Sequence, residues 1–299
     1  MSLAEKTAPA LAAYTAWWLA IRPRTLGASL VPVGVGLAIA SRSGHFHLGV
    51  ALATVLAALL LQIAANVAND YYDFAHGIDT AGRLGPTRVT QTGLLDPAAV
   101  KRGLWAVLGG AVLCGAFLVC AGGWPIALVG AVAAVAAVAY SAGPWPLAWY
   151  GFGEILAFVF FGPVAVCGTV LLQRSSVDLA ALLTSMPIAC LVTAIMLVNN
   201  LRDIPTDRST GKRTRAVRVG ARRTRLEYAA LVALAFAGAL LLALTVTSWA
   251  LLAFLTLPVA WVEIEAVWKR DGRHLNLSLV GTARLHALFG TLLAIGLLL

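Results

Sequence analysis

Two long apolar runs end in acidic segments, Asn66-Val67-Ala68-Asn69-Asp70-Tyr71-Tyr72-Asp73 and Asn199-Asn200-Leu201-Arg202-Asp203-Ile204-Pro205-Thr206-Asp207. Arg and Lys residues follow each segment. Of the chain's 13 Asp and Glu residues, six belong to these segments and the loops after them: Asp70, Asp73, Asp79, Asp96, Asp203 and Asp207. A carboxylate at a membrane boundary is costly unless a cation or a metal ion pairs with it. The two segments are therefore the first candidate for a functional site.

The composition of the chain is that of a polytopic membrane protein. The 299 residues are 60% hydrophobic and only 12% charged, and the mean hydropathy is +0.86. Soluble domains carry about 25% charged residues. The length suits roughly nine spans of about 20 residues joined by short loops, so we expect one membrane domain over residues 1–299, which begins with a short cytoplasmic segment at 1–16.

Nine apolar stretches predict nine membrane-spanning helices in a single bundle. They show no alternating period, and a bilayer requires spanning backbone to satisfy its own hydrogen bonds, which favours helices over strands. The stretches are Trp18–Ala40, Leu48–Asn69, Gly103–Gly122, Pro125–Tyr140, Gly153–Gln173, Leu179–Asn199, Glu227–Val246, Trp249–Trp268 and Leu275–Leu299.

The placement of the basic residues predicts the orientation of this bundle. With nine spans, all of the 22 Lys and Arg residues except Arg42 and Arg174 fall on one side of the membrane. The positive-inside rule makes that side cytoplasmic. We therefore expect the N-terminus and both acidic segments in the cytoplasm and the C-terminus outside. Because the net charge of +9 follows the topology, it indicates contact with the lipid bilayer and gives no indication of nucleic-acid binding.

The spacing of the polar residues predicts two faces that bear carboxylates. If the second span stays helical through its end, one face presents Asn66, Asn69, Asp70 and Asp73. A second face presents Asn199, Asp203 and Asp207, although Pro205 strains a regular helix there. Two such faces across a cavity would offer hard oxygen ligands suited to Mg²⁺, and the bound Mg²⁺ would in turn bind a diphosphate.

A plainer interpretation is a set of solvated loop carboxylates paired with neighbouring arginines. It explains one segment well but leaves two similar segments on the same predicted side of the membrane unaccounted for. Basic residues near the segments offer phosphate-binding groups, and most of them are equally suited to anchoring the chain beside anionic lipid. The candidates for binding phosphate or a substrate carboxylate are Arg83, Arg88, Lys212, Arg213 and Arg215, of which Arg88 and Lys212 are singled out.

These residues resemble the UbiA superfamily of membrane prenyltransferases. The first segment continues into Gly77-Ile78-Asp79 and Arg83-Leu84-Gly85-Pro86-Thr87-Arg88, and the second into Arg208-Ser209-Thr210-Gly211-Lys212. Three more stretches agree with the superfamily and, more narrowly, with its 1,4-dihydroxy-2-naphthoate polyprenyltransferase branch. They are Ile21-Arg22-Pro23-Arg24, Tyr140-Ser141-Ala142-Gly143-Pro144 and Gly151-Phe152-Gly153-Glu154.

The resemblance implies a nine-helix bundle around a central cavity open to the cytoplasm. It implies that Asp70, Asp73, Asp203 and Asp207 are the catalytic residues and hold Mg²⁺, with help from Asn66. The same resemblance assigns phosphate contacts to Lys212 and Arg88, and Arg83 and Asn199 are further candidates for binding the diphosphate. One position departs from the pattern, because Gly77 stands where many members have a third Asp. The role of Asp79, the next acidic residue, is left open for that reason, and the role of Asn69 is also left open.

The implied reaction transfers a polyprenyl group from polyprenyl diphosphate to 1,4-dihydroxy-2-naphthoate, with loss of CO₂ and pyrophosphate, to give demethylmenaquinol. Arg22 is expected to pair with the carboxylate of the acceptor, and Tyr140 to stack on its ring; both are equally suited to the membrane interface. Glu154 should point inward, in catalysis or in a contact between helices. Other acceptors, such as hydroxybenzoate or homogentisate, stay open, and a more remote alternative is a secondary transporter of an anionic substrate.

Overall fold

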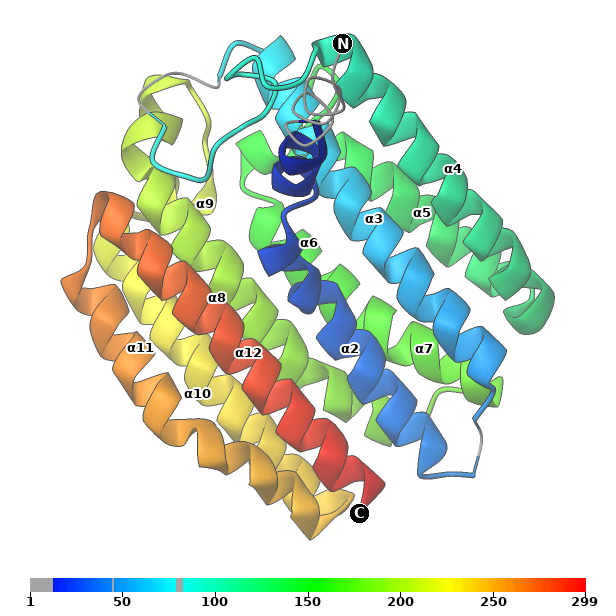
Figure 1. Ribbon diagram of the computed structural model, residues 1–299. Helices are drawn as coiled ribbons and strands as arrows, with labels where there is room; N and C mark the ends of the chain where they lie inside the picture. Colours follow the sequence, from blue (N-terminus) through cyan, green and yellow to red (C-terminus); the bar gives the residue numbers. More distant parts are fainter. Residues whose placement is uncertain (1–12, 45, 79–82) are drawn as a thin grey trace, which may run out of the picture.

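The computed structural model describes residues 13–44, 46–78 and 83–299, and in these residues every regular element is a helix (Figure 1). The helices run alongside one another as a bundle, which confirms the predicted all-α membrane fold. Residues 13–21 are helical. After them come α2 Pro23–Ser41, α3 Leu48–Ala75, α4 Pro97–Gly122, α5 Trp124–Ala139, η1 Leu147–Tyr150, α6 Gly153–Val159, η2 Phe160–Val164, α7 Ala165–Arg174, α8 Leu179–Ser209, α9 Arg215–Val219, α10 Ala221–Thr245, η3 Ser248–Thr256, α11 Leu257–Lys269, η4 Gly272–His274 and α12 Leu275–Leu298.

Eight helical segments of the described chain are long and apolar enough to cross a membrane. They match eight of the nine predicted spans. The remaining one, α5, is apolar but has only 16 residues. At a rise of about 1.5 Å per residue it is shorter than a hydrocarbon core of about 30 Å, so the ninth crossing stays a prediction. The protein is an integral, multi-pass membrane protein.

Helix α8 is the centre of the bundle. In an apolar stretch of 18 residues within α8, 72% of the residues are buried, against 17% in the corresponding stretches of α3 and α4. It packs against α10, α12 and α6, and α12 in turn packs against α2. One hydrophobic cluster surrounds α8, α10 and α12, and a smaller one joins α3 to α4. The acidic faces of α3 and α8 therefore belong to two different cores.

Several predicted spans are interrupted, and local chemistry explains where. The stretch Gly153–Arg174 is α-helical at both ends, but it widens into a π-helical turn at η2, where Pro163 lacks the N–H of a regular helix. Gly162 in this turn faces α8 so closely that a Cβ there would lie 2.3 Å from that of Ala189. The first span is broken at Arg22, which has φ 55° directly before Pro23.

The two exceptions to the charge rule, Arg42 and Arg174, both have acceptors. Arg42 follows α2 and donates from Nη2 to the carbonyl of Val246 at 3.2 Å and from Nη1 to that of Leu297 at 3.5 Å, where α10 and α12 end. Cations at helix C-termini are stabilising. Arg174 pairs at 2.9 Å with Asp178. Burial raises the pKa of Asp178, but hydrogen bonds from the Ala181 amide and from Arg174 outweigh this, so the pKa lies below its usual value.

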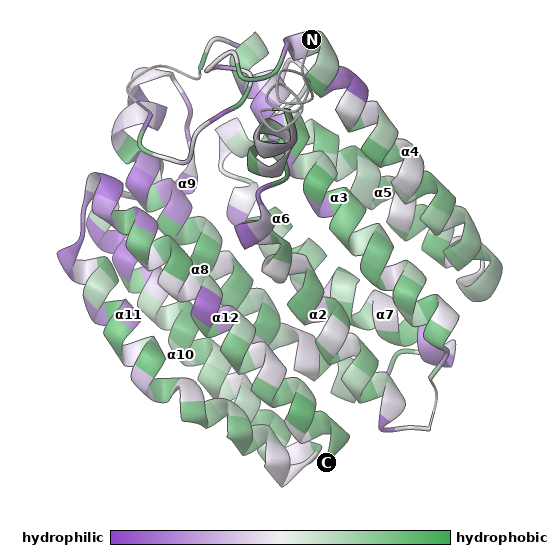
Figure 2. Cartoon of the chain, in the orientation of Figure 1, coloured by the Kyte–Doolittle hydropathy of each residue, from purple (hydrophilic) through white to green (hydrophobic). Residues whose placement is uncertain are grey.

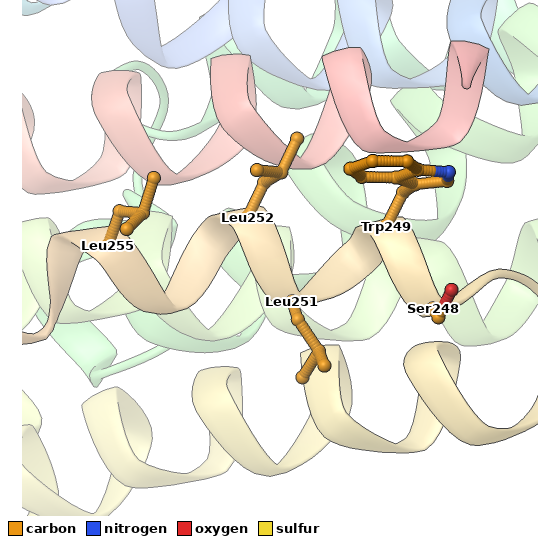
Figure 3. A pocket seen from close by; sticks show the side chains of 5 residues that line it. All are labelled: Ser248, Trp249, Leu251, Leu252 and Leu255. Carbon is orange, nitrogen blue, oxygen red and sulfur yellow. The ribbon is translucent and has the colours of Figure 1, made fainter.

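Hydrophilic residues gather at the end of the bundle near α9, whereas most residues along the rest of the helices are hydrophobic (Figure 2). The C-terminus lies at the opposite end (Figure 1). Near the C-terminus, η3 forms an apolar surface hollow lined by Ser248, Trp249, Leu251, Leu252 and Leu255 (Figure 3). This hollow lies far along the bundle from the acidic segments and suits contact with lipid.

The packing of η3 against α12 depends on Gly296. A Cβ at this position would lie 2.2 Å from the carbonyl oxygen of Trp249. We therefore expect Gly296→Ala to lower the stability of the detergent-purified protein by about 1–3 kcal/mol, as overpacking does. Gly115→Ala on α4 is the matched control, because nothing lies within 4 Å of a Cβ there. Equal thermal unfolding midpoints for the two variants would contradict this close approach.

Candidate active site

Helix α3 carries the first acidic segment on a buried face. The helix continues to Ala75, as the spacing predicted, and Asp70 and Asp73 are 1% and 6% exposed. Asp70 accepts hydrogen bonds from the backbone amides of Val89 at 3.0 Å and Thr90 at 2.9 Å. Both of its oxygens are therefore used to hold the loop after α3 against the helix.

Asp73 lies between two cations that come from different halves of the chain. Arg88 donates from Nη2 to Oδ2 of Asp73 at 2.8 Å, and Nζ of Lys212 lies 3.6 Å from Oδ1. The backbone amide of Lys212 donates to the carbonyl of Asp207 at 2.8 Å. One lysine thus ties the end of α8 to the acidic face of α3, which brings the two predicted motifs together.

The second acidic face is built by α8, which runs through Pro205 to Ser209. Asp207 is buried and accepts a hydrogen bond from the Thr214 hydroxyl at 3.3 Å. The same hydroxyl accepts from the amide of Val217 at the start of α9. Thr214 thereby connects the acidic face to the basic loop that carries Lys212.

Arg202 is a central residue of the site that the sequence analysis did not single out. It is 1% exposed and pairs with Asp203 through two hydrogen bonds of 2.7 and 2.6 Å. It also donates to Asn199 and Asn276, each at 2.8 Å, and Asn276 donates to the carbonyl of Leu84 at 2.9 Å. The position of Arg202 inside the second segment was the available signal; nothing in the sequence marked Asn276.

Asn66 and Arg22 meet at the break in the first span. The Asn66 amide donates to the Ile21 carbonyl and to the Thr25 hydroxyl, each at 2.9 Å. Nε and Nη2 of Arg22 are buried and have no hydrogen-bond partner within the part of the chain that the structure describes. Such a guanidinium favours an anion.

A second group of residues packs against α8 at Met196 and Asn200, before its acidic face. The hydroxyl of Tyr140 contacts the sulfur of Met196 at 3.5 Å. A Cβ on Gly153 would lie 3.1 Å from the same hydroxyl. Glu154, 6% exposed, accepts a hydrogen bond at Oε1 from Asn200 at 2.9 Å. The inward orientation expected for Glu154 is therefore found.

The other predicted residues occupy the rim of the site. The Ser141 hydroxyl donates to Asn69, which joins the end of α5 to α3. Arg83 donates to the carbonyl of Pro86 at 3.2 Å and lines a surface hollow together with Arg273. Asp79 lies outside the described residues.

A divalent metal would have to be held by few ligands from this chain. Among the described residues, no group of three or more His, Cys, Asp or Glu side chains is close enough to bind one ion. Mg²⁺ commonly takes one or two carboxylates and completes its shell with water and phosphate oxygens. The donor chemistry at Asp73 and Asp207, two buried carboxylates of which neither is locked in a two-point pair with an arginine, fits this mode.

Comparison with known proteins defines the family. The family profile described as UbiA prenyltransferase family matches residues 29–293. The chain belongs to this family. It is 33% identical over 285 residues to a protein of Bacillus subtilis named 1,4-dihydroxy-2-naphthoate octaprenyltransferase, covering 94% of this chain and 92% of that one. A protein of the same name from Mycobacterium tuberculosis is 37% identical over 254 residues, 84% of this chain and 85% of that one.

Solved structures of distant UbiA homologues share the fold. One from Archaeoglobus fulgidus, bound to GPP and Mg²⁺, has a TM-score of 0.67 at 17% identity and covers 95% of this chain and 99% of that one. The apo structure of a homologue from Aeropyrum pernix has a TM-score of 0.66 at 18% identity, covering 89% and 97%. This UbiA protein is an all-helical membrane prenyltransferase.

The contacts of Asp70 assign it a structural role that can be measured. In Asp70→Asn, an NH₂ donor replaces one of the two oxygens that accept hydrogen bonds from the Val89 and Thr90 amides. An unpaired buried group costs about 1–3 kcal/mol, so we expect roughly 10- to 100-fold faster hydrogen–deuterium exchange across residues 86–93. Asp207→Asn makes the same chemical change on α8 and serves as the control. Unchanged exchange in Asp70→Asn would contradict this role.

Proposed function

We propose that this protein transfers a polyprenyl group from polyprenyl diphosphate to 1,4-dihydroxy-2-naphthoate, with loss of CO₂ and pyrophosphate, in menaquinone biosynthesis. The proposal draws on the names of the relatives at 33–37% identity over most of the chain. The observation that carries it is the double attachment of Lys212, whose amide binds the carbonyl of Asp207 and whose ammonium lies 3.6 Å from Asp73. A diphosphate binds convergent cations, and the carboxylates beside them suit the metal ion that accompanies it.

The donor diphosphate binds between α3 and α8. Arg88 and Lys212 flank Asp73, and both offer N–H donors for phosphate oxygens. Arg22 has two guanidinium nitrogens without a partner among the described residues, and it follows Ile21, whose carbonyl accepts a hydrogen bond from Asn66 on the acidic face of α3. The polyprenyl tail extends into the apolar bundle.

Asp73 and Asp207 would hold Mg²⁺, with Asp70 and Asp203 orienting the surrounding loop and arginine. Bound Mg²⁺ would neutralise the charge that develops on the leaving pyrophosphate. Asp203 is engaged by both Nε and Nη2 of Arg202, so it reaches a ligand only through a change in that pair. This divides the four aspartates into two that face a ligand and two that position neighbours.

The proposed reaction needs no reactant besides the polyprenyl diphosphate and the dihydroxynaphthoate. The bond between the allylic carbon and the diphosphate oxygen breaks, and its electron pair leaves with pyrophosphate. The ring carbon that bears the carboxylate forms a bond to the allylic carbon. The bond from that ring carbon to the carboxylate then breaks, CO₂ leaves, and its electron pair restores the aromatic ring. The protein excludes water from the cationic stage by the surrounding apolar helices.

Purified protein supplied with polyprenyl diphosphate and 1,4-dihydroxy-2-naphthoate should form a decarboxylated, prenylated naphthoquinol with Mg²⁺ and none with EDTA. Asp73→Asn should lower kcat by at least about 100-fold, a typical loss for one group that stabilises developing charge. Asp271→Asn is the control, because that side chain is 84% exposed and pairs with Arg225 outside the site.

An acceptor panel under the same conditions tests the substrate. Product from hydroxybenzoate or homogentisate alone would reject the naphthoate assignment and keep prenyl transfer. Absence of product with every acceptor, from protein that unfolds cooperatively, would reject the proposed reaction.

We also propose that the acidic faces open to the cytoplasm, as the distribution of Lys and Arg indicates. In a variant without the four native cysteines, a single cysteine at Arg273 should resist a membrane-impermeant maleimide in intact cells and react after lysis. A single cysteine at Ser176, an exposed residue of the loop between α7 and α8, should react in intact cells. The reverse labelling pattern would contradict the proposed orientation and place the acidic faces outside.

A further inference from the structure

The strongest unexplained feature of the site is the second carboxylate oxygen of Glu154. Oε1 accepts from Asn200, but Oε2 is buried and has no hydrogen-bond partner among the described residues. A buried polar atom without a partner is destabilising, because it has lost its hydrogen bonds to water without replacing them. A contact that served only to join α6 to α8 would need one polar atom on each side and would not leave a second one buried and unused.

The partner of Glu154 places it on the substrate side of α8. Met196, Asn200, Asp203 and Asp207 recur at intervals of four, three and four residues, which is the spacing of one stripe along a helix. Glu154 binds this stripe at Asn200, one turn before the acidic residues. Its free oxygen therefore belongs to the wall of the same site.

Tyr140 continues that wall. Its hydroxyl contacts Met196 on the same stripe of α8, and it lies against Gly153, the residue before Glu154. An aromatic ring that stacks beside Tyr140 would thus present its substituents to Glu154 while its reacting edge faces the diphosphate.

We propose that Glu154 is a positioning residue for the acceptor, binding a ring hydroxyl group through Oε2. This rests on the proposed function in that the acceptor is a hydroxylated aromatic ring. The hydroxyl donates to Oε2, and Asn200 keeps the carboxylate in place through Oε1. The hydrogen bond fixes which ring carbon meets the allylic carbon and raises the electron density of the ring.

Glu154→Gln tests the proposal, because the amide keeps the shape and the acceptor for Asn200 but offers N–H groups where Oε2 stood. Hydrogen bonds to charged groups contribute about 1.5–3 kcal/mol, so we expect the KM for 1,4-dihydroxy-2-naphthoate to rise roughly 10- to 100-fold. The KM for polyprenyl diphosphate should stay within about twofold. Glu263→Gln is the matched control, because Oε2 of Glu263 is also buried without a partner among the described residues but lies on α11, outside the site.

A substrate series separates positioning from a merely structural role. The wild-type protein should prefer the dihydroxy acceptor over the mono-O-methyl ether that blocks the bound hydroxyl, and Glu154→Gln should lose most of that preference. Equal losses with the acceptor and with both of its mono-methyl ethers would overturn the proposal. So would an unchanged KM.

A second variant and a binding measurement test the same role of Glu154 independently. Should Glu154→Gln fail to fold, Gly153→Ala places a methyl group 3.1 Å from the Tyr140 hydroxyl and should raise the acceptor KM alone. Acceptor binding, followed by quenching of tryptophan fluorescence, needs no turnover. If the panel shows another hydroxylated acceptor, the naphthoate assignment fails while the same comparison with that acceptor still decides the role of Glu154; equal affinity of wild type and Glu154→Gln would overturn it.

Discussion

Buried carboxylates in an apolar bundle require cations or hydrogen-bond donors held at the same depth, and this constraint organises the whole site. The energetic cost of an uncompensated buried charge is several kcal/mol. Each aspartate of the two acidic faces has its own solution: two backbone amides for Asp70, Arg88 and Lys212 for Asp73, a two-point pair with Arg202 for Asp203, and the Thr214 hydroxyl for Asp207. The loops between the helices supply most of these partners, so the loops are ordered by the charges that they neutralise.

The same constraint explains why the site lies between two hydrophobic cores. The cluster around α8, α10 and α12 and the smaller one around α3 and α4 each bury apolar faces of their own helices. Polar faces turned toward the seam between them find partners across it, as Lys212 does with Asp73. A cavity for a charged head and an apolar tail needs such a boundary, with polar groups at one end and lipid-like walls along the rest.

Much of this could be predicted from the sequence, because hydropathy, charge placement and helical spacing depend on neighbours along the chain. The spans, the helical continuation through Asp73 and the convergence of the two segments follow from such patterns. The role of Arg202 as a hub does not, because it depends on Asn276 and Leu84, distant in sequence. The π-turn at η2 likewise depends on the close approach of Gly162 to Ala189, which only the folded bundle defines.

The pairs seen in the site are also what a charged substrate would exchange. Arg88 and Lys212 neutralise Asp73 when no diphosphate is bound. Mg²⁺ and a diphosphate arrive with opposite charges that largely cancel, so the cations can turn toward phosphate as the carboxylate turns toward the metal. The net charge buried in the site changes little in this exchange. Since desolvation is the main penalty for buried ions, a site that is already charge-balanced can accept a charged donor without first being rebuilt.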